Sequence, residues 1–304
     1  MTLELYDSLS RNVRPVDPVE PGRFSMYTCG PTVYGPIHVG NARPYVVALV
    51  LRRHLRRQRI DARVVCNITD INEKIDVPAR ELGISSVEHA RACAEAYIAD
   101  TDRLGLGRPD AEPLASETVP QIVALIGRLI ERGLAYAAAG DVYFRVRAFP
   151  GYGALSGQRV EDLVEAGRIE PGPGKEAPAD FALWKARKPD QDSWWPSPWG
   201  DGRPGWHIEC SVMASEHLGE TFDAHGGGLD LIFPHHENER AQSEGANGCT
   251  FARTWMHNGM LRFGGDKMSK SLGNVEPLWQ ALDRHGPETL LLLFHRAHYR
   301  KPFD

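Results

Sequence analysis

The densest group of metal-binding side chains in the sequence lies in residues 233–239, which read FPHHENE. The proline of this segment suits the first turn of a helix, so His235 and Glu239 would lie four residues apart on one helix face. Imidazole nitrogen and carboxylate oxygen are both zinc ligands, and two ligands on adjacent turns can share one ion. His236 and Glu237 are rival ligands that this spacing does not separate from the first pair.

Two cysteines could complete a four-ligand zinc site. Cys29 and Cys210 each stand where a stretch with strand character runs into a turn. Strand ends converge at one edge of a parallel sheet, so residues that are distant in the sequence can meet there. Each residue alone has a plainer interpretation, because a single cysteine usually belongs to the core.

A glycine-containing segment, residues 35–41, reads GPIHVGN and lies between a predicted strand and the start of a predicted helix. Such a junction offers free backbone N–H groups and the positive end of the helix dipole, and both suit phosphate. His38 can donate a hydrogen bond to a phosphate, and Gly40 lets a nucleotide lie against the backbone. By itself this pattern is most often only a turn.

A second charged segment, residues 267–271, reads KMSKS and is flanked by glycines. Lys267 and Lys270 on such a loop could close over a triphosphate and neutralise the charge on departing pyrophosphate. The alternative is a solvated basic loop. Residues 226–228, three glycines, lack the lysine of a P-loop and predict a close-packed turn. The basic run at residues 52–57 predicts a solvated helix face.

The elements around these residues alternate between strand and helix. The predicted order is strand 23–29, helix 41–59, strand 61–68, helix 87–104 and helix 120–132. Val47, Leu51 and Leu55 are spaced as the apolar stripe of the first helix. This βαβ order predicts an α/β fold with a doubly wound parallel sheet of the Rossmann type.

The middle of the chain differs in character. Residues 110–204 read as irregular, and residues 193–206 hold four of the seven tryptophans among prolines and glycines. This pattern predicts an insertion with ordered aromatic loops. From Trp206 the α/β alternation returns, and a last helix ends at residues 290–294. The sheet is therefore expected in two halves separated by an inserted domain.

Composition excludes several classes of protein. The 304 residues carry a net charge of −5, which argues against a protein held to nucleic acid by bulk electrostatics but does not exclude a local basic face. No DNA partner is expected. The five cysteines are scattered without a CxxC pair, which indicates a reducing cytoplasm and no disulfide framework. The apolar run at residues 45–51 is far below the roughly 18 residues of a membrane span. No membrane partner and no secretory signal are expected.

Two of these motifs resemble the paired ATP motifs of class I aminoacyl-tRNA synthetases, namely HVGN at residues 38–41 and KMSKS at residues 267–271. Further segments resemble cysteinyl-tRNA synthetases: MYTCGPTVY at 26–34, NITD at 67–70, PGWHIECS at 204–211, HGGG at 225–228 and FPHHENE at 233–239. The resemblance extends from about Leu5 to Arg300. It implies a Rossmann-type catalytic domain that is split by a connective insertion.

The resemblance also implies a set of site residues. One zinc ion would be held by Cys29, Cys210, His235 and Glu239, which selects His235 over His236. ATP, with Mg²⁺, would be bound by His38, Gly40, Asn41, Lys267, Ser269 and Lys270, of which His38, Lys267 and Lys270 would be catalytic. Thr69, Trp206 and Asp230 would line the amino-acid pocket.

The chemistry implied by the family is adenylation of cysteine. Zinc favours the deprotonated thiol of the substrate and rejects the harder hydroxyl of serine. The substrate carboxylate attacks the α-phosphate of ATP and forms cysteinyl-adenylate, so no protein nucleophile is needed. The acceptor end of a tRNA would then receive the cysteine.

The sequence departs from the family pattern at three places. Asn41 replaces the second histidine of the class-wide motif, and Asn72-Glu73 replaces a usual pair of aspartates. Family members continue into a helical domain that reads the anticodon, which this chain is expected to lack. The expected domains are residues 1–112 and 205–280 for the catalytic halves, 113–204 for the insertion, and 281–304 for the start of a truncated helical region.

Other functions fit parts of the pattern. The acceptor could be a small-molecule amine or a carrier protein, as in a stand-alone cysteine-adenylating paralog. A non-catalytic cysteine or zinc sensor is disfavoured by the intact His38, Lys267 and Lys270, and a zinc hydrolase by four protein ligands that leave no site for water. A monomer is expected.

Overall fold

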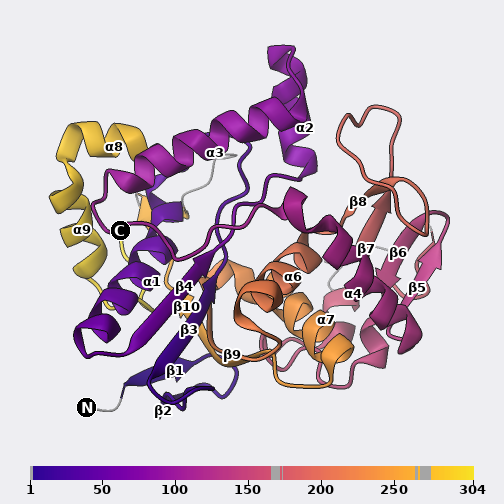
Figure 1. Ribbon diagram of the computed structural model, residues 1–304, viewed down its shortest axis with the longest axis horizontal. Helices are drawn as coiled ribbons and strands as arrows, with labels where there is room; N and C mark the ends of the chain where they lie inside the picture. Colours follow the sequence, from indigo (N-terminus) through magenta and orange to yellow (C-terminus); the bar gives the residue numbers. More distant parts are fainter. Residues whose placement is uncertain (1–2, 166–171, 173, 264–265, 268–274) are drawn as a thin grey trace. The chain divides into compact units, whose positions relative to one another are not determined.

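The computed structural model describes residues 3–165, 172, 174–263, 266–267 and 275–304 (Figure 1). The chain forms two compact units. Unit 1 comprises Met1–Leu114, Phe222–Leu231 and Ala252–Asp304, and unit 2 comprises Ala115–Thr221 and Ile232–Phe251. Within the described residues, no helix combines the length and the apolar character needed to span a membrane.

Unit 1 is built on a parallel sheet of four strands in the order β10-β9-β3-β4. The strands are β3 (Arg23–Thr28), β4 (Asp61–Cys66), β9 (Phe222–Gly228) and β10 (Ala252–Asn258). Met26 of β3 aligns with Val64 of β4 on one side and with Ala224 of β9 on the other. Strands from both ends of the chain therefore share one sheet, which confirms the predicted α/β class.

Helix α1 (Val39–Arg57) packs against β3, β4 and β9. It begins two residues before the predicted start, and its predicted stripe is only partly right. Leu55 is buried, whereas Val47 and Leu51 are half-buried because the face that contains Val46 and Leu49 turns toward the sheet. The predicted apolar stripe of α1 is therefore shifted by about one residue from the face that is buried against the sheet.

The basic run at residues 52–57 was predicted to be a solvated helix face, and this prediction is only partly right. Arg52 is buried, and its guanidinium lies 3.1 Å from the Asp110 carboxylate. Arg56 reaches the same carboxylate at 2.6 Å. Two of the arginines therefore tie α1 to the segment after β4.

The predicted glycine turn at residues 226–228 is also wrong, because these residues belong to strand β9. The close packing that was expected there is present. A Cβ atom on Gly226 would lie 2.5 Å from the terminal methyl of Met26 on the neighbouring strand. Glycine here lets two adjacent strands hold a bulky core side chain between them.

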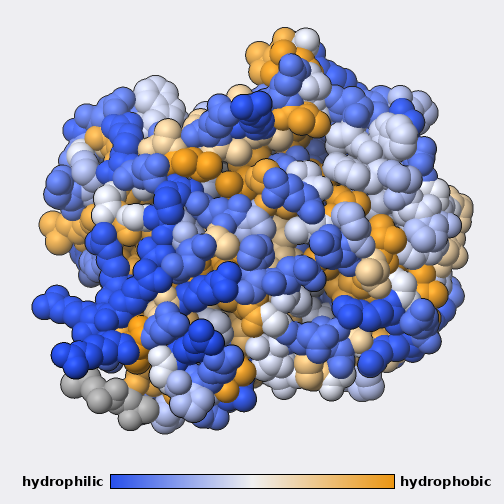
Figure 2. Space-filling view, in the orientation of Figure 1, coloured by the Kyte–Doolittle hydropathy of each residue, from blue (hydrophilic) through white to orange (hydrophobic). Residues whose placement is uncertain are grey.

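The rest of unit 1 consists of helices and short hairpins. They are β1 (Glu4–Asp7), β2 (Asn12–Pro15), α2 (Glu73–Leu82), α3 (Ser86–Asp102), η3 (Leu229–Leu231), β11 (Arg262–Phe263), β12 (Asp266–Lys267), α8 (Leu278–His285) and α9 (Pro287–His295). Helices α3 and α9 lie where helices were predicted. The tip of the α2–α3 pair exposes Leu82, Ile84 and Val87, and Figure 2 shows apolar surface over this end of α2.

Helix α2 was not predicted, and one departure from the family pattern explains where it begins. The Asn72 side chain accepts the Lys74 N–H at 3.1 Å and caps the helix. Glu73 occupies the first turn, where the helix dipole favours a negative charge. The pair Asn72-Glu73 therefore forms a helix start.

Unit 2 contains an antiparallel sheet of four strands in the order β5-β6-β7-β8. The strands are β5 (Ala135–Ala138), β6 (Asp141–Phe144), β7 (Phe181–Ala186) and β8 (Gly202–Pro204). The prediction of an irregular middle segment is therefore wrong. The strands are three to six residues long and lie between glycine- and proline-rich segments, which hides their alternation.

Helices cover the remainder of unit 2. They are η1 (Ala115–Thr118), α4 (Val119–Glu131), η2 (Val146–Ala148), α5 (Val160–Glu165), α6 (Trp206–Leu218), η4 (Ile232–His236) and α7 (Glu237–Asn247). Helix α4 agrees with the predicted helix 120–132. It packs on α6 and α7, and its buried residues include Ile122, Leu125 and Leu129. The domain boundaries expected at residues 113, 205 and 281 remain predictions.

Candidate functional site

Three predicted metal ligands lie together inside unit 2. Cys210 comes from α6, His235 from η4 and Glu239 from α7. Their ligand atoms all lie within 4.8 Å of one another, and each residue is at most 1% exposed. Because α6 packs directly on α7, the two helices bring the sulfur to the imidazole and the carboxylate.

The local structure around these ligands differs from the sequence prediction in two ways. Cys210 lies within helix α6, not at the end of a strand. Pro234 lies in η4, and α7 begins only at Glu237. His235 Nε2 is nevertheless 3.1 Å from Glu239 Oε1, because the backbone still completes one turn between the two residues.

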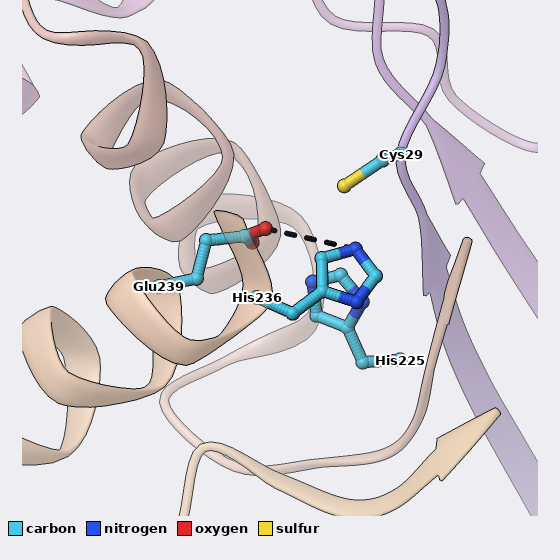
Figure 3. Close-up of side chains that lie close together, drawn as sticks. All are labelled: Cys29, His225, His236 and Glu239. Atoms are coloured by element: carbon cyan, nitrogen blue, oxygen red, sulfur yellow. Dashed lines mark ion pairs between the residues drawn. The ribbon is translucent and has the colours of Figure 1, made fainter. Parts of the chain in front are cut away.

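The Glu239 carboxylate faces two imidazoles. His236 Nε2 lies 3.9 Å from Glu239 Oε1, a pair that Figure 3 marks with a dashed line. A fully buried carboxylate beside a thiol and imidazoles is costly unless a cation or a set of donors compensates its charge. Sulfur, nitrogen and oxygen donors at this spacing are the ligand types that zinc prefers. The cluster is therefore compatible with a metal site.

His207, which sequence analysis gave no role, orients one of these ligands. Its Nδ1 lies 2.8 Å from His235 Nδ1, and burial, followed by the nearby Lys185, lowers the pKa of His207 to about 3. A neutral His207 can accept a hydrogen bond from His235 Nδ1–H. That tautomer leaves the lone pair of His235 Nε2 on the side of Glu239, as a metal ligand requires.

Trp206, predicted to line the substrate pocket, lies on the same imidazole. Its ring stacks on His235 with centroids 4.1 Å apart and planes 21° apart, and the residue is 36% exposed. Trp206 thus covers one face of a predicted ligand and keeps part of its own surface open.

Glu237, the rival ligand, has other partners. Its buried carboxylate accepts the Ser156 N–H at 2.8 Å and lies 3.6 Å from Arg240. The spacing of the sequence alone could not separate Glu237 from Glu239. The structure separates them by the groups that surround each carboxylate.

In unit 1, Cys29 directly follows β3, as predicted, and donates its N–H to the Gly226 carbonyl at 3.1 Å. The next residue is held by Asn67, whose Oδ1 accepts the Gly30 N–H at 2.9 Å. The Asn67 amide also donates to the Thr69 hydroxyl at 3.0 Å. Thr69, a predicted substrate contact, is therefore a buried partner of the segment that carries Cys29.

The first nucleotide motif lies at the start of α1. His38 is the N-cap residue, and its N–H donates to Asn41 Oδ1 at 3.2 Å. This segment pairs with residues 276–278 through two backbone hydrogen bonds. The Val39 N–H donates to the Glu276 carbonyl at 3.0 Å, and the Leu278 N–H donates to the Ile37 carbonyl at 2.9 Å. The chain that follows the KMSKS motif thus returns to the N-terminus of α1.

The remaining predicted residues are only partly described. Lys267 lies in β12, where only its backbone is described. Ser269 and Lys270 lie outside the described residues. Gly40 is in the first turn of α1, and Asp230 is exposed in η3.

Comparison with known proteins gives consistent matches. The family model described as the tRNA synthetases class I (C) catalytic domain matches residues 15–304. A cysteine–tRNA ligase of Caldicellulosiruptor saccharolyticus is 48% identical over 302 residues, which are 99% of this chain and 65% of the relative. One from Xylella fastidiosa is 52% identical over 306 residues, again 65% of its length. The chain spans about 65% of the length of these relatives.

Among solved structures, methionyl-tRNA synthetase of Mycobacterium tuberculosis, in complex with methionyl-adenylate, matches with a TM-score of 0.70 and 16% identity. The match covers 92% of this chain and 65% of that chain. At this identity the likeness concerns the fold alone. It supports the Rossmann-type α/β architecture that was predicted from the sequence.

Proposed function

The chain belongs to the family of class I (C) tRNA synthetase catalytic domains, and from this premise we propose that it activates L-cysteine with ATP and transfers it to the acceptor end of tRNA. The products of the first step are cysteinyl-adenylate and pyrophosphate. The observation that carries the proposal is the buried cluster of Cys210, His235 and Glu239, whose donor types suit an ion that selects a thiol. We also place this activity in the cytoplasm, where the free cysteines stay reduced.

The proposed zinc site has four ligands. Cys210, His235 and Glu239 are the ligands that unit 2 would supply, and the family resemblance implies Cys29 as the fourth. When bound, zinc supplies a soft electrophilic site that favours a thiolate over the hydroxyl of serine. The neutral His207 holds the His235 ring in the orientation that this role requires.

The proposed nucleotide site lies at the N-terminus of α1. The positive end of its dipole favours phosphate, with Gly40 allowing close approach and His38 donating a hydrogen bond. Because the oxygen of Asn41 already accepts the His38 N–H, its NH₂ group is the part left to contact phosphate. Asn41 is thus a neutral and weaker partner than a histidine. Lys267 and Lys270 would hold the β- and γ-phosphates, Ser269 would also contact ATP, and Mg²⁺ would be bound to the nucleotide.

Activation then depends on positioning and charge. The substrate carboxylate attacks the α-phosphate in line, and the lysines offset the charge on departing pyrophosphate. The exposed carboxylate of Asp230 suits the substrate ammonium group. The Trp206 ring forms a wall beside His235, and Thr69, through Asn67, supports the segment that carries Cys29.

The test is exchange of labelled pyrophosphate into ATP with zinc and magnesium present. We expect exchange with cysteine and none with serine. Cys210→Ala should raise the cysteine KM by at least about 100-fold while the KM for ATP changes little, since a ligand of the thiol-selecting ion is lost. Cys249→Ala, which removes another cysteine of unit 2, is the matched control. No exchange with cysteine in the wild-type chain would refute the proposal.

The acceptor is tested separately by offering the activated enzyme tRNA, tRNA without its anticodon arm, and small amines. We expect transfer to both tRNAs. Transfer only to an amine or to a carrier protein would instead assign the chain to cysteine adenylation for another pathway. Cysteine binding without exchange would identify a sensor.

A further inference from the structure

A loop of unit 2, residues 149–158, lies against the first turn of α7, the helix that carries Glu239. The Ser156 N–H donates to Glu237 Oε2 at 2.8 Å. The Tyr152 hydroxyl donates to Asn238 Oδ1 at 2.5 Å, and the Arg240 guanidinium donates to the Gly151 carbonyl at 2.9 Å. The loop therefore contacts residues 237, 238 and 240, on both sides of Glu239 in the sequence.

These contacts are buried and involve charge. Glu237 and Asn238 are at most 1% exposed. Arg240 lies 3.6 Å from Glu237 and 3.1 Å from Glu244, so its charge compensates the buried carboxylate. Burial, with the charge of Glu237 next in effect, raises the pKa of Tyr152 well above its ordinary value. The hydroxyl therefore keeps its proton and remains a donor to Asn238.

The same loop reaches His235 through a row of aromatic rings. The Tyr152 ring stacks on Phe181 of β7 with centroids 6.5 Å apart and planes 27° apart. Phe181 meets His207 edge to face at 5.8 Å, and His207 Nδ1 lies 2.8 Å from His235 Nδ1. Tyr152 thus contacts α7 directly and is connected to His235 of η4 through Phe181 and His207.

Glycines let the loop take this path. Gly153 has φ +89°, and a Cβ atom there would overlap the Gln158 carbonyl. A Cβ atom on Gly151 would lie 3.2 Å from the Arg240 guanidinium. The sequence GYGALSG at residues 151–157 therefore supplies a narrow turn with one large side chain, Tyr152, directed at α7.

We propose that the 149–158 loop is a positioning element for the metal ligands, and that Tyr152 and Glu237 hold His235 and Glu239 in place for the ion. This inference rests on the zinc site of the proposed function. Groups that orient metal ligands from outside the coordination sphere commonly change metal affinity about 10- to 100-fold when they are removed. Fixing α7 and the His235 ring before the ion arrives lowers the cost of ordering them on binding.

Tyr152→Phe tests the inference because it removes one hydroxyl and keeps the ring stack on Phe181. Tyr143→Phe is the matched control, since Tyr143 is also in unit 2 and its hydroxyl donates to Asp141 at 2.7 Å, within its own strand β6. The readout is the zinc dissociation constant, measured by competition with a chelator on the full chain. We expect Tyr152→Phe to raise it about tenfold and Tyr143→Phe to change it less than twofold.

A second variant, Glu237→Gln, keeps the shape of the side chain and an acceptor for Ser156 but loses the charge that faces Arg240. It should also weaken zinc binding while the urea midpoint of the apoprotein stays near that of Tyr143→Phe. Equal zinc affinity in Tyr152→Phe and Tyr143→Phe would overturn the inference. A wild-type chain that binds no zinc would instead overturn the metal site of the proposed function.

Discussion

Replacing Arg43 by methionine should destabilise unit 1 strongly and in a defined region. Arg43 is in α1, is 1% exposed and donates to the carbonyls of Gly259, His298 and Lys301. Its guanidinium also lies 4.5 Å from the centre of the Phe303 ring. Burial lowers the pKa of Arg43 to about 10, so the side chain is still a cation at neutral pH.

The expected magnitude follows from what methionine leaves behind. The aliphatic part of the site stays filled, but the Gly259 and Lys301 carbonyls lose a charged donor, while the His298 carbonyl keeps the Lys301 N–H at 2.9 Å. Each buried acceptor left unpaired costs about 1–3 kcal/mol. Removing a poorly hydrated cation offsets part of this loss. We expect a net decrease of about 3–5 kcal/mol in the free energy of unfolding, at the upper end of single substitutions.

Arg52→Met is the matched control, because it removes another buried guanidinium from the same helix. Its partner Asp110 keeps the Arg56 guanidinium at 2.6 Å and the Val64 N–H at 2.8 Å. The carboxylate therefore stays compensated, and the expected loss is only about 1–2 kcal/mol.

Amide hydrogen exchange is the right assay, because a chain with two units need not unfold in one step. The informative amides are those of Gly259, Arg262 and Phe303, which join residues 259–262 to residues 299–303. A loss of about 3 kcal/mol should speed their exchange about 100-fold in Arg43→Met, with little effect in Arg52→Met. Similar exchange rates in the two variants would show that Arg43 does not hold these segments together.

Two further predictions concern unit 1. Burial lowers the pKa of His257 to about 3, so as the pH drops the unfolded chain protonates this imidazole before the folded chain does. The free energy of unfolding therefore falls by up to roughly 1.4 kcal/mol per pH unit as the pH drops from 6.5 toward 3. His257→Gln should flatten this dependence in urea titrations and the exposed His54→Gln should not; an unchanged slope in His257→Gln would contradict the assignment. Gly30→Ala would place a methyl group on the Asn67 carbonyl oxygen and should cost at least about 3 kcal/mol. Gly226→Ala should cost less, because its one close contact, at 2.5 Å, is with the flexible end of Met26. Equal urea midpoints for the two alanine variants would refute this steric argument.

The regular elements of unit 1 could be predicted because their signals are local. Strand β3, helix α1 and strand β4 begin within two residues of the predicted positions, since each carries its own pattern and its own boundary residues. The core face of α1 was misplaced because the arrangement of the sheet, and not the helix itself, decides which side is covered. The parallel order followed from the βαβ alternation.

The sheet of unit 2 could not be predicted in the same way. Strands β6 and β7 pair across a long intervening segment, and β8 has only three residues. No window of sequence contains both partners of such a pair. Helix α6, by contrast, had a local signal that was missed, because Ile208 and Val212 are buried four residues apart on one face.

The predicted ligand pair His235 and Glu239 is brought together although the helix boundary was wrong, because four residues complete a turn in either geometry. His207 could not be assigned from spacing, since only tertiary packing brings it to His235 from 28 residues away.

The first turn of α7 serves two purposes at once, and this explains why its residues are so polar and yet so buried. Glu239 is directed at His235, while Glu237 and Asn238 are directed at the 149–158 loop. Successive residues of a helix are turned by about 100°, so neighbours in sequence serve different faces. Three proposed metal ligands, Cys210, His235 and Glu239, accordingly belong to unit 2, the unit that contains the insertion, and not to unit 1, which contains the parallel sheet. The 149–158 loop belongs to the same unit, so under the proposal above the insertion would be part of the scaffold of the metal site.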